Sequence, residues 1–144
     1  MKTILVTGTS SGIGNQICIQ AAAMNFRVIS VSRNIEPLKD LGGIESFKLD
    51  ITDKDSVDDF VTNLKNRKIK IDILINNAGY LISELFNETT YDSFKKTFDV
   101  NVFGLAEITR SLIPIINKDG HVINISSIGG CLLYTSPSPR DSNL

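Results

Sequence analysis

The sequence has very few of the residues that build metal centres, disulfide frameworks and histidine-dependent catalytic sites. It contains one histidine, His121, and two cysteines, Cys18 and Cys131, which do not form a CxxC pair. The chain therefore has too few His and Cys residues for a typical zinc site, and a Ser-His-Asp triad could use only one histidine. We predict no metal site. His121 follows Gly120 and is expected to be an ordinary residue at the start of a strand. The free cysteines fit a reducing, cytoplasmic setting.

An excess of charge of one sign and long apolar runs are also missing. Lys and Arg number 15 against 16 Asp and Glu, and the formal net charge is −1. This balance gives no electrostatic reason to expect nucleic acid or an anionic membrane as a partner. The apolar run that begins at Ile4 ends at Thr7, which is too short for a signal-peptide core or a membrane span. We expect a cytoplasmic protein that binds neither nucleic acid nor membrane.

Short apolar segments alternate with segments of helical periodicity along residues 1–130, which we expect to form one domain. The apolar segments are rich in Ile, Val and Leu without polar alternation, which is typical of parallel strands buried on both faces. They cover residues 3–7, 27–31, 45–49, 72–76 and 120–126. Helical spacing of apolar residues covers 13–24, 57–64 and 91–116, with Thr52 or Asp53 as the cap of the second helix. The alternation predicts an α/β fold, a Rossmann-like doubly wound parallel sheet that is truncated after its fifth strand.

A glycine-rich turn follows the first predicted strand and opens the first predicted helix. Gly8 would let the chain turn sharply, Gly12 would let the backbone approach a diphosphate, and Gly14 would let the helix pack closely. The exposed N–H groups and the positive end of the helix dipole would then hold the phosphates. The alternative is a structural turn that binds nothing. The predicted cofactor-binding residues of this turn are Gly8, Ser10, Ser11, Gly12, Ile13 and Gly14.

The turn reads TGxxxGxG, and with this spacing the chain resembles the short-chain dehydrogenase/reductase family over residues 3–130. The segment Asn76-Asn77-Ala78-Gly79 is similar to the NNAG motif of the family, which supports the sheet and lines the ribose side of the cofactor. Asp50 resembles the carboxylate that contacts the adenine amino group, although an Asp after a strand is also a common turn or cap residue. The resemblance therefore implies that Asp50, Asn77, Ala78 and Gly79 contact a dinucleotide.

The end of the second predicted strand distinguishes between two dinucleotides. An NAD site usually places Asp or Glu there to accept a hydrogen bond from the ribose 2′-hydroxyl. This sequence has Ser32 instead, followed by Arg33, whose permanently charged donor fork suits a 2′-phosphate. We therefore favour NADP(H) over NAD(H) as the cofactor. A solvated surface arginine is the alternative interpretation of Arg33.

In the family that the chain resembles, hydride transfer between a nicotinamide and a carbonyl or alcohol uses an Asn, a Ser, a Tyr and a Lys in this chain order. The resemblance assigns Asn101 to organise a proton-relay water and Ser127 to bind the substrate oxygen. Asn has a poor helix propensity, so its place in an apolar helical pattern indicates a purpose. The alternatives are that Asn101 is an ordinary polar helix residue and that Ser127 is an ordinary turn serine.

The Tyr and Lys of the family's YxxxK motif do not follow Ser127, and no lysine occurs after Lys118. Tyr91 and Lys95 have this spacing, but they precede Asn101 and are expected on a surface helix turn. We therefore expect oxidoreductase activity of a longer parent protein on a small-molecule carbonyl or alcohol, and negligible activity of this chain. The alternatives are a nucleotide-binding module or sensor without turnover, and a fold relative that binds nothing.

Two further expectations concern the parts of the chain outside this site. Residues 131–144 read CLLYTSPSPRDSNL, and 131–141 resemble the translation of a sequencing-library transposase adapter. We expect native sequence to stop near Gly130 and a non-native tail to follow, the alternative being a flexible loop. The resemblance also implies that the helix over 91–116 is buried in a subunit interface. The parent protein is therefore expected to be a homo-oligomer, and this chain to associate or dissolve poorly.

Overall fold

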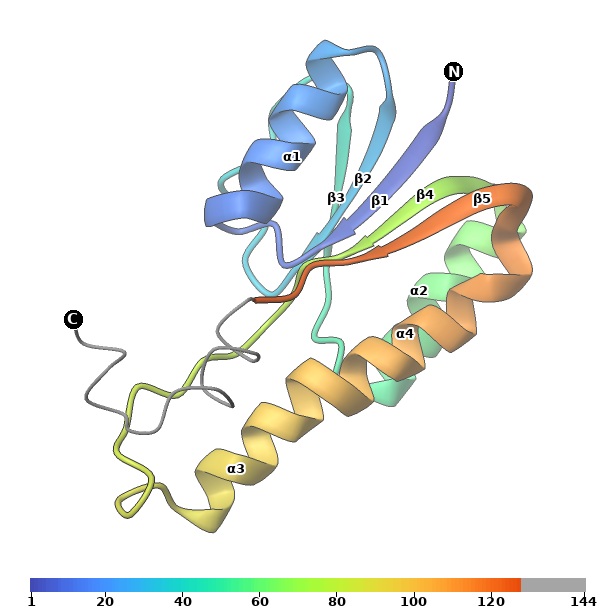
Figure 1. The fold of residues 1–144 in the computed structure, drawn as a ribbon. Coiled ribbons are helices and arrows are strands. Elements are labelled where there is room, and N and C mark those ends of the chain that lie inside the picture. The colour runs from blue at the N-terminus through green and yellow to red at the C-terminus, as the bar shows by residue number, and fades with distance from the viewer. Residues whose placement is uncertain (128–144) are drawn as a thin grey trace.

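Within residues 1–127, which the computed structural model describes, five parallel strands form one sheet (Figure 1). The strands are β1 Thr3–Thr7, β2 Arg27–Ser32, β3 Ile44–Lys48, β4 Ile71–Asn76 and β5 Ile116–Asn124. Their spatial order is β3-β2-β1-β4-β5. From the central strand β1 the chain adds β2 and β3 on one side, and then crosses to add β4 and β5 on the other side. The predicted α/β class and Rossmann-like parallel sheet are confirmed. The predicted tail, 131–144, lies outside the described residues.

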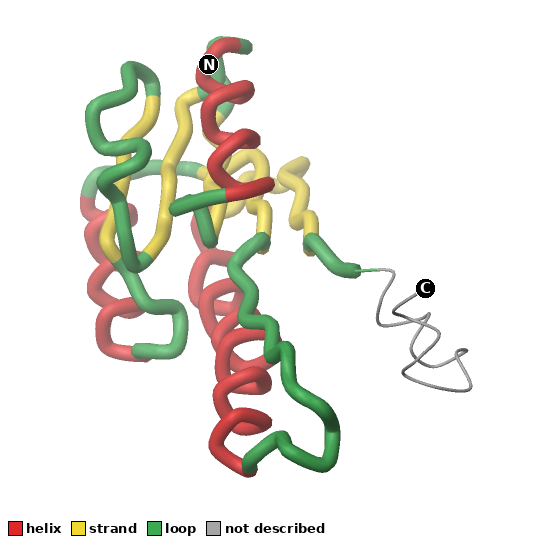
Figure 2. Tube along the Cα trace, turned by 90° about the vertical axis from the view of Figure 1, so that its left-hand side faces the viewer, coloured by secondary structure: helices red, strands yellow, loops and turns green. Residues whose placement is uncertain are grey.

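Helices cover both faces of the sheet and connect all consecutive strands except β2 and β3 (Figures 1 and 2). Two of them follow β1 and β3, namely α1 Gly12–Ala23 and α2 Lys54–Asn66. Between β4 and β5 the chain forms α3 Tyr91–Phe98, a π-helical segment η1 Asp99–Gly104, α4 Leu105–Leu112 and a 3-10 turn η2 Ile113–Ile115. Within residues 1–127, none of these helices combines the length and apolar character that crossing a bilayer requires.

Successive residues of β1 pack into two separate cores, because side chains along a strand point to opposite faces of the sheet. Ile4 packs with Cys18 of α1 on one face. Leu5 belongs to the cluster on the other face, which holds Leu64 of α2 and Leu112 of α4. Burial raises the pKa of the Cys18 thiol to about 12, so this cysteine serves as an apolar core residue at neutral pH.

Side-chain caps fix the beginnings of α2 and α3, but not that of α1. Asp53 accepts a hydrogen bond from the Ser56 amide, so the structure selects Asp53 over Thr52 as the cap of α2. Thr90 caps α3 in the same way. Ser11 precedes α1 and makes no capping bond with its side chain. The amides of the first turn of α1 are therefore left for another acceptor.

The segment predicted as one long helix, 91–116, is interrupted by the wider π-helical turn η1. A Cβ atom at Gly104 would lie 3.0 Å from Ile51 Cγ1 and 3.1 Å from the Ile51 carbonyl oxygen. The glycine therefore lets η1 approach the loop after β3. Pro114 lies in the 3-10 turn that ends the segment, and because it has no N–H it cannot continue the helical hydrogen bonds of α4.

Strand β5 begins at Ile116 rather than at the predicted residue 120. Ile116 pairs with Ile71, but His121 pairs with Ile73, so additional residues of β5 bulge out between the two pairs. His121 therefore lies inside the strand and not at its start. Among the described residues β5 is one of the two edge strands, and most of its side chains are exposed.

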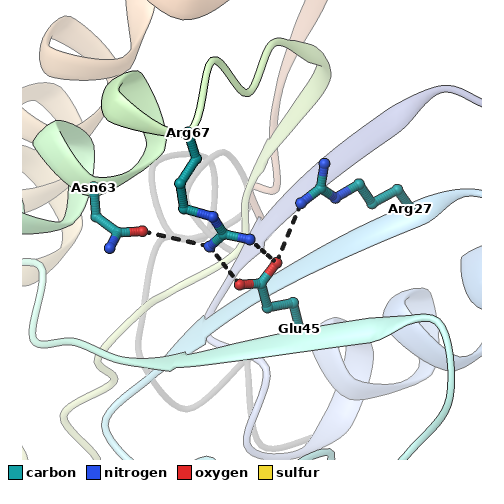
Figure 3. A network of polar contacts seen from close by, with 4 residues as sticks. All are labelled: Arg27, Glu45, Asn63 and Arg67. Carbon is teal, nitrogen blue, oxygen red and sulfur yellow. Dashed lines mark hydrogen bonds and ion pairs between the residues drawn. The ribbon is translucent and has the colours of Figure 1, made fainter.

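One carboxylate connects three elements at the amino edge of the sheet (Figure 3). Glu45 of β3 accepts hydrogen bonds from Arg67 Nη1 at 2.5 Å and Nη2 at 3.0 Å, and from Arg27 Nη2 at 3.4 Å. Arg67 caps the carboxyl end of α2 and also donates to Asn63 Oδ1 at 3.4 Å, while Arg27 opens β2. Hydrogen bonds from Arg67, and to a smaller extent Arg27, hold the pKa of Glu45 below its ordinary value.

Replacing Glu45 by Gln (E45Q) is expected to lower the free energy of unfolding by about 0.5–1 kcal/mol at neutral pH, because the network is partly exposed and screened by solvent. Since the pKa is lowered in the folded state, this contribution is present above the ordinary value of 4.5 and is lost as the pH falls through the folded-state value. Urea denaturation of both chains from neutral pH down to about pH 3 measures the difference.

The control for this prediction is Glu36→Gln, which removes the carboxylate of an exposed pair with Lys39 at 3.6 Å. We expect that variant to change stability little at any pH. A difference between the wild-type chain and E45Q that persists unchanged on acidification would contradict the assigned role of Glu45.

Candidate functional site

A cavity of about 450 Å³ lies where the carboxyl ends of the strands meet. Its walls come from the segments that follow β1, β2, β3 and β4, and from α3 and η1. In parallel α/β sheets this edge, beside the strand where the chain reverses its direction of winding, is where ligands bind. Residues predicted to bind the cofactor that line this cavity are Gly8, Ser10, Ser11, Arg33, Asp50, Asn77, Ala78 and Gly79.

The other three predicted residues of the glycine turn lie at the start of α1. Gly12 has a φ of +59°, and a Cβ atom there would meet nothing within 4 Å, so open space faces it. Ile13 has an exposed side chain, and only its backbone amide fits the predicted role. Gly14 is buried, and a Cβ atom there would lie 2.5 Å from the Gly8 carbonyl oxygen. The close packing predicted for Gly14 is therefore made against the turn itself.

The turn after β1 and the segment after β4 are locked together by backbone contact and hydrogen bonds. A Cβ atom at Gly8, whose φ is +72°, would lie 2.6 Å from Ala78 Cα. Asn77 Nδ2 donates to the carbonyl oxygens of Thr7 and Gly8 at 3.1 and 2.9 Å. Thr7 Oγ1 accepts from the Asn77 and Ala78 amides at 3.1 and 3.0 Å. Thr7 directly precedes the first glycine, but it is not among the residues predicted from the sequence.

A buried pair of hydroxyl groups anchors the turn to β2. Thr9 Oγ1 lies 2.7 Å from Ser30 Oγ, and both residues are fully buried. Asn15 Nδ2 donates to the Thr9 carbonyl oxygen at 3.3 Å. The turn is thus held from β2, β4 and α1, so its amides are oriented before any ligand arrives.

Arg33 lies in a tight turn after β2 with an exposed side chain. Ser32 Oγ donates to the Asn34 carbonyl oxygen at 2.6 Å, and Asn34 Oδ1 accepts from the Glu36 amide at 3.1 Å. No carboxylate of residues 1–127 forms an ion pair with Arg33. Arg33 also lines the cavity, so within the described residues its charge has no acidic partner there.

Asp50 forms the turn that the sequence left open as one alternative, and its adenine contact stays a prediction. Its Oδ1 accepts hydrogen bonds from the amide and the hydroxyl of Thr52 at 2.9 and 2.7 Å, so it does form a turn. It also lines the cavity. Its second carboxylate oxygen makes no hydrogen bond within the described residues and remains for a donor.

Asn101 lies in η1 and clamps the backbone that follows the NNAG segment. Its Oδ1 accepts from the Tyr80 amide at 2.7 Å, and its Nδ2 donates to the Tyr80 carbonyl oxygen at 2.8 Å. Tyr80, the residue that follows Gly79 in the chain, lines the cavity. The sequence analysis expected Asn101 to serve a relay water and missed this clamp, because the pairing joins residues far apart in the chain. The structure shows that the side chain positions a wall of the cavity.

The other catalytic candidates lie on the surface of the described chain. Ser127 follows β5 at the carboxyl edge of the sheet, and its side chain is exposed. The YxxxK look-alike occupies the first turns of α3, where Tyr91 is 79% exposed and Lys95 pairs with Asp99 at 2.5 Å. No group of three or more His, Cys, Asp or Glu residues within positions 1–127 is arranged to hold a metal ion.

Comparisons with known proteins agree with this arrangement. The model of the short chain dehydrogenase family matches residues 2–138. A fatty acyl-CoA reductase of Acinetobacter baylyi is 36% identical, over 89% of this chain and 48% of that protein. A 3-ketodihydrosphingosine reductase of Bacteroides thetaiotaomicron is 31% identical, over 91% of this chain and 49% of that protein. The chain thus spans about half the length of these curated relatives.

Solved structures resemble the chain equally clearly. A short-chain dehydrogenase of Streptomyces avermitilis has a TM-score of 0.82 and 38% identity, covering 90% of this chain and 50% of that one. ElxO with NADP bound has a TM-score of 0.81 and 28% identity, covering 96% and 58%. A short chain dehydrogenase of Leptospira borgpetersenii with bound NAD+ has a TM-score of 0.86 and 26% identity, covering 96% and 55%.

Replacing Asn101 by Ala (N101A) is expected to release the Tyr80 amide from its acceptor. We expect the free energy of unfolding to fall by about 1–2 kcal/mol, because a partly buried amide loses its partner. Hydrogen exchange of the Tyr80 amide and of residues 81–90 should become faster, while that of β1 and β4 stays unchanged. Exchange followed by mass spectrometry or NMR measures this.

Asn117→Ala is the matched control, because Asn117 bonds Asp72 at 2.8 Å at the opposite edge of the sheet. That variant should leave exchange at Tyr80 as it is in the wild-type chain. Equal exchange at Tyr80 in N101A and wild type would show that the clamp does not hold this segment.

Proposed function

Because the chain belongs to the short chain dehydrogenase family, we propose that it binds a nicotinamide dinucleotide in the cavity at the carboxyl edge of its sheet. We further propose that the whole protein transfers hydride between this cofactor and a carbonyl or alcohol substrate. The family supplies the class of reaction, whereas the residues that hold the cofactor are argued from the cavity. Since the chain spans about half the length of its curated relatives, activity is proposed for the whole protein.

The observation that carries the proposal is the uncapped amino end of α1, which opens at the glycine turn. The helix has no side-chain cap and no acidic residue in its first turn, whereas Asp55 and Asp92 occupy the first turns of α2 and α3. Free amides and the positive end of a helix dipole together favour a phosphate. Open space at Gly12, with its positive φ, gives the diphosphate room to approach the backbone. The residues present therefore fit a dinucleotide.

NADP(H) is proposed as the preferred cofactor because of the residues that follow β2. Solved relatives include one with NADP and one with NAD+, so the fold accommodates either dinucleotide. Discrimination then depends on side chains near the ribose 2′ position. Here Ser32 stands where a carboxylate would bind the 2′-hydroxyl, and Arg33 would offer its guanidinium to a 2′-phosphate.

The bound dinucleotide would supply or accept the hydride, and residues of this chain would position the reactants. We propose that Ser127 donates a hydrogen bond to the substrate oxygen. Asn101 would hold Tyr80 in the cavity wall, and its remaining hydrogen-bonding capacity would serve the relay water. The general acid and base of the family's YxxxK motif have no counterpart after Ser127 in the sequence. We therefore propose that these residues alone bind the dinucleotide without turning over substrate.

The loop after Tyr80 favours a substrate that carries an apolar chain. Leu81, Leu85 and Phe86 are 88%, 60% and 82% exposed, and the Phe86 ring packs edge-on against Phe94 of α3 with 5.8 Å between ring centroids. Large apolar side chains that remain exposed together are typical of a binding surface. Two relatives are named for fatty acyl-CoA and 3-ketodihydrosphingosine. We propose a carbonyl compound with an aliphatic chain as the substrate.

An apolar face on the helix after this loop supports assembly of the whole protein into a homo-oligomer. Phe98, Val102 and Phe103 are 53%, 45% and 62% exposed along α3 and η1, and no residue of α3 is buried. Covering this face with a second copy of the protein would remove it from water.

Replacing Arg33 by Gln (R33Q) should weaken NADPH binding by about tenfold or more, because a charge-assisted hydrogen bond to the 2′-phosphate is lost. NADH carries no such phosphate, and its affinity should stay unchanged. Titration of the folded chain, followed by nicotinamide fluorescence and by melting temperature, measures both affinities. Arg110→Gln is the control, because Arg110 is an exposed arginine of α4 paired with Glu107 outside this cavity.

Equal weakening of NADPH and NADH by R33Q would refute the assignment of Arg33 to the 2′-phosphate. A folded wild-type chain whose melting temperature and fluorescence respond to neither dinucleotide would refute the proposed cofactor altogether. Steady-state turnover of aldehydes by these residues would refute only the proposal that they bind without turnover.

A further inference from the structure

Lys96 places a second cation at the wall of the dinucleotide cavity. It lies on α3 with an exposed side chain, and its ammonium nitrogen is 4.4 Å from the centroid of the Tyr80 ring. Lys96 and Tyr80 both line the cavity. An ammonium at this distance over an aromatic face is attracted by the electron density of the ring. The side chain of Lys96 therefore has a defined position in spite of its exposure.

The Tyr80 ring is the seat of this cation, and hydrogen bonds hold the backbone that carries the ring. Asn101 holds the Tyr80 backbone with two hydrogen bonds at 2.7 and 2.8 Å. Three residues earlier in the chain, Asn77 is bonded to the glycine turn. The loop after β4 also runs beside α3 in both views of the fold (Figures 1 and 2). The position of Lys96 is thus coupled to the segment that holds the phosphate-binding turn.

Within residues 1–127, the charge of Lys96 is not paired with a carboxylate. Asp99 also lines the cavity, but it pairs with Lys95 at 2.5 Å. Among the described residues no carboxylate forms an ion pair with Lys96. Lys96 and Arg33 are therefore the two cations of the cavity wall that lack an acidic partner.

The order of the strands separates these two cations. Arg33 follows β2 and Tyr80 follows β4, while the glycine turn follows β1, which lies between β2 and β4. The turn therefore has Arg33 on one flank and the Tyr80 seat of Lys96 on the other. A dinucleotide whose 2′-phosphate lies at Arg33 presents its diphosphate to the turn between the two flanks.

We propose that Lys96, seated on the Tyr80 ring, is a second cationic determinant of dinucleotide binding. It attracts the diphosphate charge that NADPH and NADH share, whereas Arg33 distinguishes the 2′-phosphate. The inference rests on the proposed function, since it requires a dinucleotide in this cavity. The attraction is Coulombic, and it is stronger at the wall of a cavity than on an open surface because less water screens it.

The test is a fluorescence titration of the full chain with NADPH and with NADH, comparing wild type, Lys96→Gln, Lys96→Arg and Lys65→Gln. Lys65 is the matched control, because it is an exposed helical lysine in the last turn of α2, at the opposite edge of the sheet. We expect K96Q to raise the dissociation constants of both dinucleotides by about threefold to tenfold at low salt. K96R and K65Q should bind as the wild type does.

A double-mutant cycle with Tyr80→Leu tests whether the Tyr80 ring positions Lys96 for binding. This change removes the ring but keeps the backbone that Asn101 holds. If the ring positions the ammonium, K96Q should weaken binding markedly less in the Y80L background than in the wild-type background. The loss caused by K96Q should also shrink as the salt concentration rises, because ions screen the attraction.

Each outcome separates this inference from the proposed function. If wild type binds both dinucleotides and K96Q binds them equally well, the role of Lys96 is refuted while the proposed function stands. A loss confined to NADPH would also overturn the inference, because Lys96 would then act on the 2′-phosphate. Equal effects of K96Q with and without the Tyr80 ring would show that the ring does not position the Lys96 ammonium. Absence of binding by folded wild type would overturn the proposed function itself.

Discussion

The contact between the glycine turn after β1 and the segment after β4 determines the geometry of the whole site. At Gly8 a side chain would collide with the Ala78 backbone, and Asn77 and Thr7 add hydrogen bonds in both directions across the same contact. Two neighbouring strand ends are thereby held at a fixed separation. The cavity lies at this junction, between the segments that follow β2 and β3 on one side and the loop and helix that follow β4 on the other.

The site uses conformations that a protein built for stability alone would avoid. α1 begins without a side-chain cap, and Gly8 and Gly12 have positive φ angles. An absent cap lowers stability by roughly 1 kcal/mol, and glycine in a turn increases the entropy of the unfolded chain. The surrounding structure offsets these costs with the buried Thr9–Ser30 pair and with the core packed on both faces of β1. Such locally unfavourable features beside a cavity are what ligand binding requires, because a filled cap would occupy the donors.

Local signals in the sequence predicted the strands and the glycine turn well, whereas contacts between distant residues were missed. β1 was predicted at its observed bounds, since a buried parallel strand is a continuous apolar run with glycine directly after it. The early start of β5 depends on a bulge against β4, and the π-helical turn depends on the approach of Gly104 to Ile51. Neither follows from periodicity, because both are set by a partner segment tens of residues away in the chain. The clamp of Asn101 on Tyr80 was missed for the same reason, although the unusual Asn had been noticed.

The two cations of the cavity differ in how firmly the fold holds them, and this difference matters for what each can do. Arg33 follows the buried strand β2 directly, so the contact that we propose with the 2′-phosphate would be carried by an element with little freedom. Lys96 is carried by α3, which buries no residue and is held mainly through η1, the Tyr80 contact and the Phe86–Phe94 pair. Attraction of a diphosphate falls off slowly with distance and tolerates such freedom, whereas hydrogen-bonded discrimination does not.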